Sequence, residues 1–215
     1  MQDVIESTFM VPGDGVLRGM RVQQFARNEG IRKCGGEPGR VEATMNRPAQ
    51  HLYPNLELIR ERGFAENKES LEEDARIERL PTSCPNLIPS IPRVEDWHNL
   101  QAAWEKDAYV AAANSTLAKS KDSMARCLTD RIGKDVDPAD PAVSFLRIAD
   151  DTMLETDDWE TGGEQKYAAA YADCGKEYFA KLGELLLKQR PEQIERNREV
   201  LTEFAVGIVK AGYVP

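Results

Sequence analysis

The stretch from residue 164 to residue 211 contains two runs of helical periodicity, and the rest of the chain is organised around it. In the first run one apolar stripe keeps to one helix face: Tyr167, Tyr171, Cys174, Tyr178, Leu182 and Leu185. Pro191 opens the second run, whose stripe is Ile194, Leu201, Phe204, Ala205, Ile208 and Val209. Two such helices joined at residues 189–191 are expected to fold back on each other as an antiparallel hairpin.

The middle of the chain is also predicted to be helical. Near-helical apolar spacing runs from Trp97 to Leu128, with a break around residues 114–115 and an end at Gly133. Asp137-Pro138 and Asp140-Pro141 are alternative N-cap and N1 pairs for the next helix, and residues 157–163 are predicted to be a turn. Strand alternation does not persist anywhere, so the chain is predicted to be all-α, a helical bundle with irregular arms.

The N-terminal half is less regular. Residues 1–15 are predicted to be an extended arm that ends in a turn, and a helix follows from Val16 to Gly30 or to Gly35-Gly36. Residues 35–54 are expected to form an irregular connection, and residues 55–62 a short helix stopped by Gly63, with Phe64 as its apolar contact. A capping-box pattern at residues 70–73 opens another helix that runs to about Arg79.

Residues 81–92 are rich in proline, which excludes a helix and favours extended backbone. The apolar residues Leu87, Ile88 and Ile91 favour an arm strapped across the helical body over a free linker. The predicted organisation is therefore an arm at 1–15, a helical and proline-rich segment at 16–93, and a C-terminal helical bundle at 94–215.

The composition and charge of the chain indicate which classes of partner it is able to bind and where the protein is located. The chain has 215 residues and a formal net charge of -9, which disfavours a nucleic acid or an anionic membrane as partner. No uncharged apolar run in the sequence, residues 185–187 included, is long enough to span a membrane. The first seven residues carry two acids and no basic region, so the start resembles a mature form whose signal peptide has been removed.

The cysteines are Cys34, Cys84, Cys127 and Cys174, and none belongs to a CxxC pair. With two histidines in the chain, a metal site is not expected. Two disulfides in an exported protein are favoured over buried free thiols in a cytosolic one. Three connectivities are open. The neighbouring scheme, Cys34–Cys84 with Cys127–Cys174, would pin the proline-rich arm to the first helix and the central helix to the C-terminal hairpin.

Several polar residues are candidate functional sites. Residues 150–155 (DDTMLE) match the acidic DDxxxE pattern that binds magnesium in all-helical terpene synthases, but no second such motif follows, so a solvated acidic helix end is favoured. Asp135, Asp137 and Asp140 lack the glycine and the final glutamate of an EF-hand loop, which favours helix capping over calcium. His51 and His98 are isolated, and Tyr167, Tyr171 and Tyr178 have the spacing of core residues.

A resemblance to a known family rests on three features in order: Trp104, the stretch MARCLTDRIG at residues 124–133, and YADC at residues 171–174. This order resembles uncharacterised secreted proteins and lipoproteins of actinobacteria, in which a tryptophan precedes a helix ending in Cys-Met-x-x-x-Gly and an Ala-rich helix carries Asp-x-x-Cys or a similar motif. The last helix, at 193–209, and Cys34 ahead of Gly35 are also similar. Leu128 replaces the family's methionine, and Gly133 falls later than in its pattern.

The resemblance covers residues 104–211 and implies an extracellular or envelope location and disulfides, without catalytic residues. The leading hypothesis is therefore an exported, non-enzymatic protein that binds a protein or an envelope component, needs no cofactor and is able to form a homo-oligomer. The alternatives are an immunity or inhibitor protein that blocks a toxin or protease, and a helical enzyme that uses a divalent ion at residues 150–155.

Overall fold

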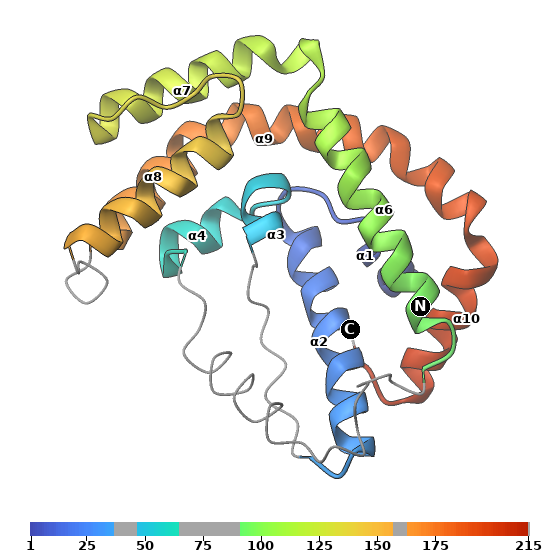
Figure 1. The fold of residues 1–215 in the computed structure, drawn as a ribbon. Coiled ribbons are helices and arrows are strands. Elements are labelled where there is room, and N and C mark those ends of the chain that lie inside the picture. The colour runs from blue at the N-terminus through green and yellow to red at the C-terminus, as the bar shows by residue number, and fades with distance from the viewer. Residues whose placement is uncertain (37–46, 65–90, 157–162, 215) are drawn as a thin grey trace.

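The computed structural model describes residues 1–36, 47–64, 91–156 and 163–214, and the regular elements in these ranges are helices (Figure 1). They are α1 (Gln2–Ser7), α2 (Asp14–Lys33), α3 (Arg47–Leu52), α4 (Leu56–Arg62), α6 (Val94–Ala112), the 3₁₀ turn η1 (Ser115–Leu117), α7 (Ala118–Ile132), α8 (Pro141–Thr156), α9 (Gly163–Arg196) and α10 (Arg198–Lys210). The all-α fold class is confirmed.

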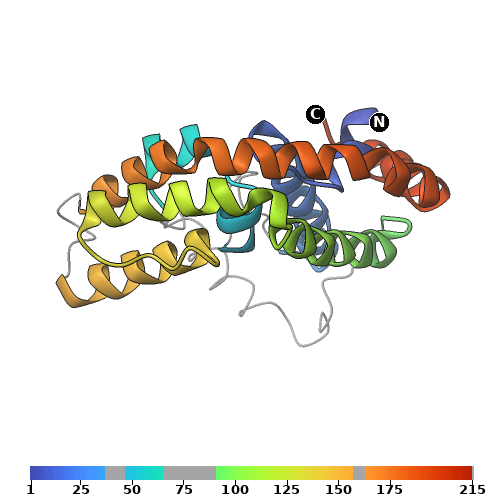
Figure 2. The ribbon, with the colours of Figure 1, turned by 90° about the horizontal axis from the view of Figure 1, so that it is seen from above.

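Helix α9 runs along the length of the described structure. Figure 2 shows it running from one end of the structure to the other, with α7 and α6 following one another alongside it. It packs against α4 and α7, and also against α6, α8 and α10. The predicted stripe explains this position, because Tyr171, Tyr178 and Leu182 are almost completely buried.

The joint between the last two helices lies later than predicted. α9 continues through Pro191 to Arg196, and α10 begins at Arg198 after Asn197, so the predicted joint at residues 189–191 is wrong. A proline inside a helix leaves the carbonyl four residues earlier without its N–H partner. Here that carbonyl belongs to Leu187, whose residue is 45% exposed, so water is available to solvate it. α10 packs against α1, α6 and α9.

Residues 1–15 do not form an extended arm. Residues 2–7 are the helix α1, and the segment after it is part of the core: Phe9 is 1% exposed. Two tryptophans of α6 hold this segment, since Trp97 Nε1 donates to Thr8 Oγ1 (2.8 Å) and Trp104 Nε1 donates to the Met10 carbonyl (2.7 Å). The Gly-Pro composition of residues 12–15 predicted the turn but gave no information about these distant partners.

Within residues 1–36 and 47–64, the helices α2, α3 and α4 follow. α2 extends to Lys33 with Cys34 as its C-cap, and α3 occupies residues 47–52 of the segment predicted to be irregular. α4 confirms its prediction: the Asn55 side chain accepts from the Leu58 N–H (2.9 Å), and Gly63 ends the helix at φ 81°. Phe64 is buried behind it, as expected for the apolar contact of such a stop.

The central helices agree with the predicted boundaries. The break predicted at residues 114–115 separates α6 from η1, and Gly133 ends α7 with φ 71°. Of the alternative starts for α8, the structure uses Asp140-Pro141: Pro141 is the first helical residue, and Asp140 Oδ1 accepts from the Val143 N–H (3.4 Å).

Several predictions fall outside the described residues. These are the helix at residues 70–79, most of the proline-rich arm, Cys84, and nearly all of the turn predicted at 157–163, whose last residue already belongs to α9. The end of the arm is described. Ile91 is buried, and a Cβ added at Gly207 of α10 would lie 2.6 Å from Pro92 Cδ, so α10 approaches this part of the chain closely.

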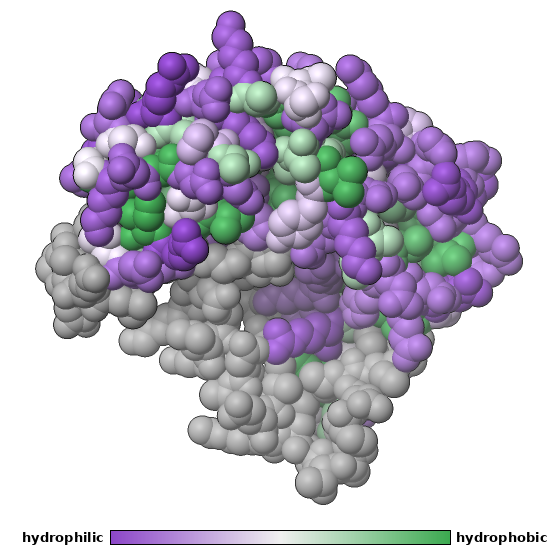
Figure 3. All heavy atoms as spheres, turned by 45° about the horizontal axis from the view of Figure 1, so that its top comes forward, coloured by the Kyte–Doolittle hydropathy of each residue, from purple (hydrophilic) through white to green (hydrophobic). Residues whose placement is uncertain are grey.

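The surface agrees with the acidic, highly charged composition. Hydrophilic residues cover most of the described part of the face in Figure 3, and hydrophobic residues show as separate small areas. None of the helices in the described ranges has the length and hydrophobicity required to cross a membrane.

Candidate binding groove

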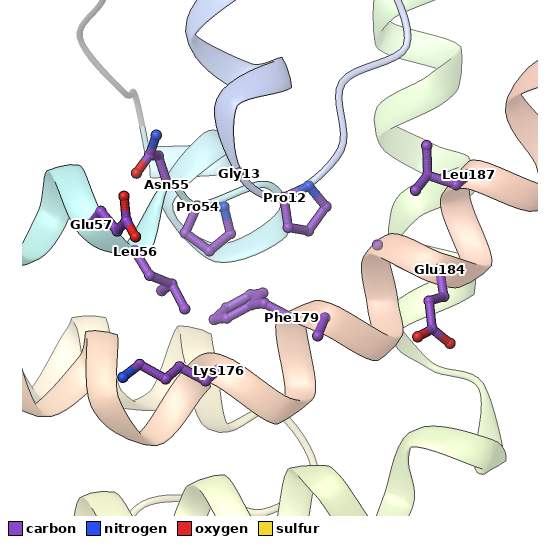
Figure 4. A pocket seen from close by; sticks show the side chains of 12 residues that line it. Pro12, Gly13, Pro54, Asn55, Leu56, Glu57, Lys176, Phe179, Glu184 and Leu187 are labelled. Atoms are coloured by element: carbon purple, nitrogen blue, oxygen red, sulfur yellow. The ribbon is translucent and has the colours of Figure 1, made fainter.

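An open groove of about 570 Å³ lies between α9, the start of α4 and the turn before α2. Its lining is mainly apolar. In Figure 4 the side chains of Leu56 and Phe179 point toward each other, and Pro12 and Pro54 form the opposite wall from α9. The remaining lining residues are Gly13, Asn55, Glu57, Lys176, Ala180, Gly183, Glu184 and Leu187.

Local backbone features hold the walls in place. Gly13 adopts φ 102°, a conformation that favours glycine, and its N–H donates to the Pro54 carbonyl (3.0 Å). This bond joins the turn before α2 to the start of α4. On the other side, a Cβ at Gly183 would lie 3.6 Å from Pro12 Cδ, so the absence of a side chain there leaves room in the groove.

The floor is continuous with the core. Phe179 is 2% exposed and packs against Tyr171 and Tyr178, with ring centroids 5.7 Å and 4.9 Å away. Leu187 at the far end is 45% exposed. The groove therefore combines a rigid apolar floor with an apolar side chain available to a ligand.

The rim carries charges of both signs. Glu57 and Lys176 lie at one end of the groove, and Glu184 and Leu187 lie at the other (Figure 4). Lys176 Nζ is 3.6 Å from Asp173 Oδ1. Within the described ranges, neither Glu57 nor Glu184 makes an ion pair. The groove thus offers two uncompensated carboxylates next to apolar surface.

Asp173 joins three helices beside the groove. Its carboxylate pairs with Arg60 of α4, with Arg131 of α7 (3.4 Å) and with Lys176 of α9. Partial desolvation alone would raise the pKa of Asp173, but the hydrogen bond from Arg60 and the three positive charges together lower it. The cluster fixes the position of α4, and hence of one groove wall, relative to α9.

Cys174, which follows Asp173 in α9, links this helix covalently to α7. Cys174 forms a disulfide with Cys127, with the two Cα atoms 5.7 Å apart. This confirms one half of the neighbouring scheme. The predicted Cys34–Cys84 bond stays a prediction, because Cys84 lies outside the described residues. By the chain-entropy model, closing a loop of 47 residues stabilises the fold by about 4 kcal/mol.

The isolated histidines are not brought together. His51 Nε2 is 2.6 Å from Tyr109 Oη, and this contact joins α3 to α6. Burial, together with the carboxylates of Glu105 and Asp140, raises the pKa of Tyr109. His98 lies at the start of α6 against the ring of Trp97 (5.1 Å).

The candidate cation sites do not assemble in the part of the chain that the structure describes, where no cluster of three potential metal ligands occurs. The side chain of Glu155 lies outside that part. Asp137 Oδ1 accepts from the Ala139 N–H (2.8 Å), and Asp140 caps α8. Asp140 therefore has the helix-capping role favoured from the sequence, whereas Asp137 accepts within the turn that precedes α8.

The tyrosines are core residues. Tyr171 is 0% exposed and Tyr178 is 2% exposed, and Tyr171 Oη donates to the Gln50 carbonyl (2.8 Å). Tyr167 packs partly buried against the same core. The prediction that these side chains pack rather than line a pocket is thus confirmed for the two most buried ones.

Sequence reasoning missed the groove. Its residues come from three segments, 12–13, 54–57 and 176–187, and none of them contains a binding motif. The available indications were indirect: glycine at position 183, and an exposed leucine at 187 outside the buried stripe. Comparison with protein-family models, curated proteins and solved structures finds no match to this chain.

Proposed function

We propose that this chain is an exported, non-enzymatic binding protein whose groove between α4 and α9 receives a segment of a protein partner or an envelope component. The observation that carries the proposal is the groove itself, with its apolar floor and two rim carboxylates that have no ion-pair partner among the described residues. Apolar surface with a few polar groups at its edge is typical of ligand and peptide sites.

The disulfide between Cys127 and Cys174 supports the export half of the proposal. Disulfides persist in oxidising compartments and are rare in the cytosol of most organisms. This bond joins α7 to α9 next to the groove, so it also holds the binding surface in shape without the partner.

A groove-blocking variant tests the binding half. Ala180 is an exposed residue of α9 that lines the groove, and Ala180→Arg would fill the space with a long side chain without disturbing the core. Wild-type protein, immobilised and exposed to the secreted and envelope fractions of its source organism, should retain a partner that Ala180→Arg loses. Ala118→Arg is the matched control, since Ala118 is an exposed alanine in α7 outside the groove.

Retention of the same proteins by all three forms would show that the groove is not the binding site. Failure of the wild type to retain any partner would count against a binding function. Circular dichroism melts of both variants separate loss of binding from loss of folding.

A further inference from the structure

The last three turns of α6, with the C-cap residue Ala113, present a largely exposed face, in which Tyr109 also contacts His51 of α3. It consists of Ala102, Ala103, Lys106, Tyr109, Val110 and Ala113, which recur every three or four residues and so share one side of the helix. Tyr109 is 43% exposed and Val110 is 73% exposed. Towards the start of α6 the same side carries polar residues, so the apolar area is confined to the end of the helix.

Lys106 is the one cation on this face. It is exposed, and within the residues described it makes no ion pair. The face therefore combines small side chains, which permit close approach, with two larger apolar side chains and an uncompensated positive charge.

The groove has the complementary composition. Its floor is apolar, and Glu57 and Glu184 supply carboxylates that lack a partner in the described part of the chain. An amphipathic helix that lays its apolar face in an apolar groove is a recurrent mode of protein recognition. A lysine on that helix within reach of Glu184 would compensate the rim charge and select the orientation.

We propose that the groove of one molecule binds the face at residues 102–113 of α6 from a second copy of this chain. The proposal rests on the function proposed above and names a partner for the same groove. The α6 face and the groove are different surfaces of one molecule, so the contact is heterologous and leaves a free groove and a free α6 face at the two ends. A single helix face buries little area, so the association is weak and concentration-dependent.

Sedimentation velocity of the purified chain tests this directly. Between about 1 and about 300 µM, the range suited to a small interface, the wild type should shift from monomer to larger species. Lys106→Glu and Glu184→Lys should each weaken association about tenfold, because each places like charges together. The double variant with both changes should recover it. Lys166→Glu, an exposed α9 lysine outside the groove, should behave as the wild type.

A monomer throughout the concentration series would overturn the proposal, as would a Lys106→Glu protein that associates like the wild type. Weakening by both single variants without recovery in the double variant would also refute the pairing of these two residues. Partner capture with Ala180→Arg is an independent measurement. A monomeric wild type that still retains a groove-dependent partner would leave the proposed function standing and remove only self-association.

Discussion

Asp173 shows how one side chain takes part in tertiary structure. It directly precedes the disulfide residue Cys174, and its carboxylate contacts cations from α4, α7 and its own helix. Sequence patterns identify Asp173 as a helical residue beside the apolar stripe. The partners Arg60 and Arg131 are 113 and 42 residues away, so the cluster depends on the packing of three helices.

Replacing Asp173 by asparagine should destabilise the fold by about 1 kcal/mol or less near neutral pH, since the cluster is partly exposed to solvent. The pKa of Asp173 is lowered from its ordinary value of 3.8, so the carboxylate contributes fully above that value. Its contribution is lost as the pH falls through the lowered folded-state pKa.

Urea unfolding of the wild type and Asp173→Asn from neutral to acid pH measures this difference. The gap between their free energies of unfolding should be constant at neutral pH and close below about pH 4. A gap that widens in acid would contradict the assigned direction of the pKa shift. Glu177→Gln, which removes an exposed pair with Lys181, is a matched control for a surface carboxylate.

At the scale of elements, local chemistry predicts several helix ends correctly, whereas the joint expected at Pro191 is wrong. Asn55, Gly63, Gly133 and Asp140 act where their capping preferences predict. Proline is a helix breaker on average, but α9 tolerates it at an exposed position and bends along its length (Figure 1). The packing of α10 on α1 and α6 then decides where the chain turns.

Pro191→Ala should therefore stabilise the protein by about 1–3 kcal/mol, because it restores the N–H that bonds to the Leu187 carbonyl and removes the clash of the proline ring. Thermal or urea unfolding measures the change. Gln189→Ala, at an exposed position two residues earlier, should change stability little. Equal or lower stability of Pro191→Ala would mean that the fold needs the rigid bend.

For the whole molecule, the disulfide and the buried N-terminal segment join distant parts of the chain. Residues 8–10 are fixed by α6, and Cys127 is linked to Cys174, 47 residues later. One cluster of buried side chains includes residues of all three segments proposed from the sequence.

Intact mass before and after reduction tests the covalent framework. Alkylation under denaturing conditions should modify no cysteine before reduction and all four after it, as expected for two disulfides. Alkylation of two cysteines without reduction would leave Cys127–Cys174 as the single bond. Alkylation of all four would argue for a reducing compartment, and the export proposal and the family resemblance would both be abandoned.

The sequence by itself determined the helical class, the capping residues, and the burial of Tyr171 and Tyr178, because periodicity and caps are local properties of the chain. Cys127–Cys174 belongs to one of the three pairings that the sequence leaves open, and the structure shows this bond. Only the tertiary structure decided that residues 8–11 enter the core, that α9 passes through Pro191, and that segments around residues 12, 55 and 180 meet in a groove. Those outcomes depend on contacts between residues far apart in the chain, and such contacts leave no periodic pattern in the sequence.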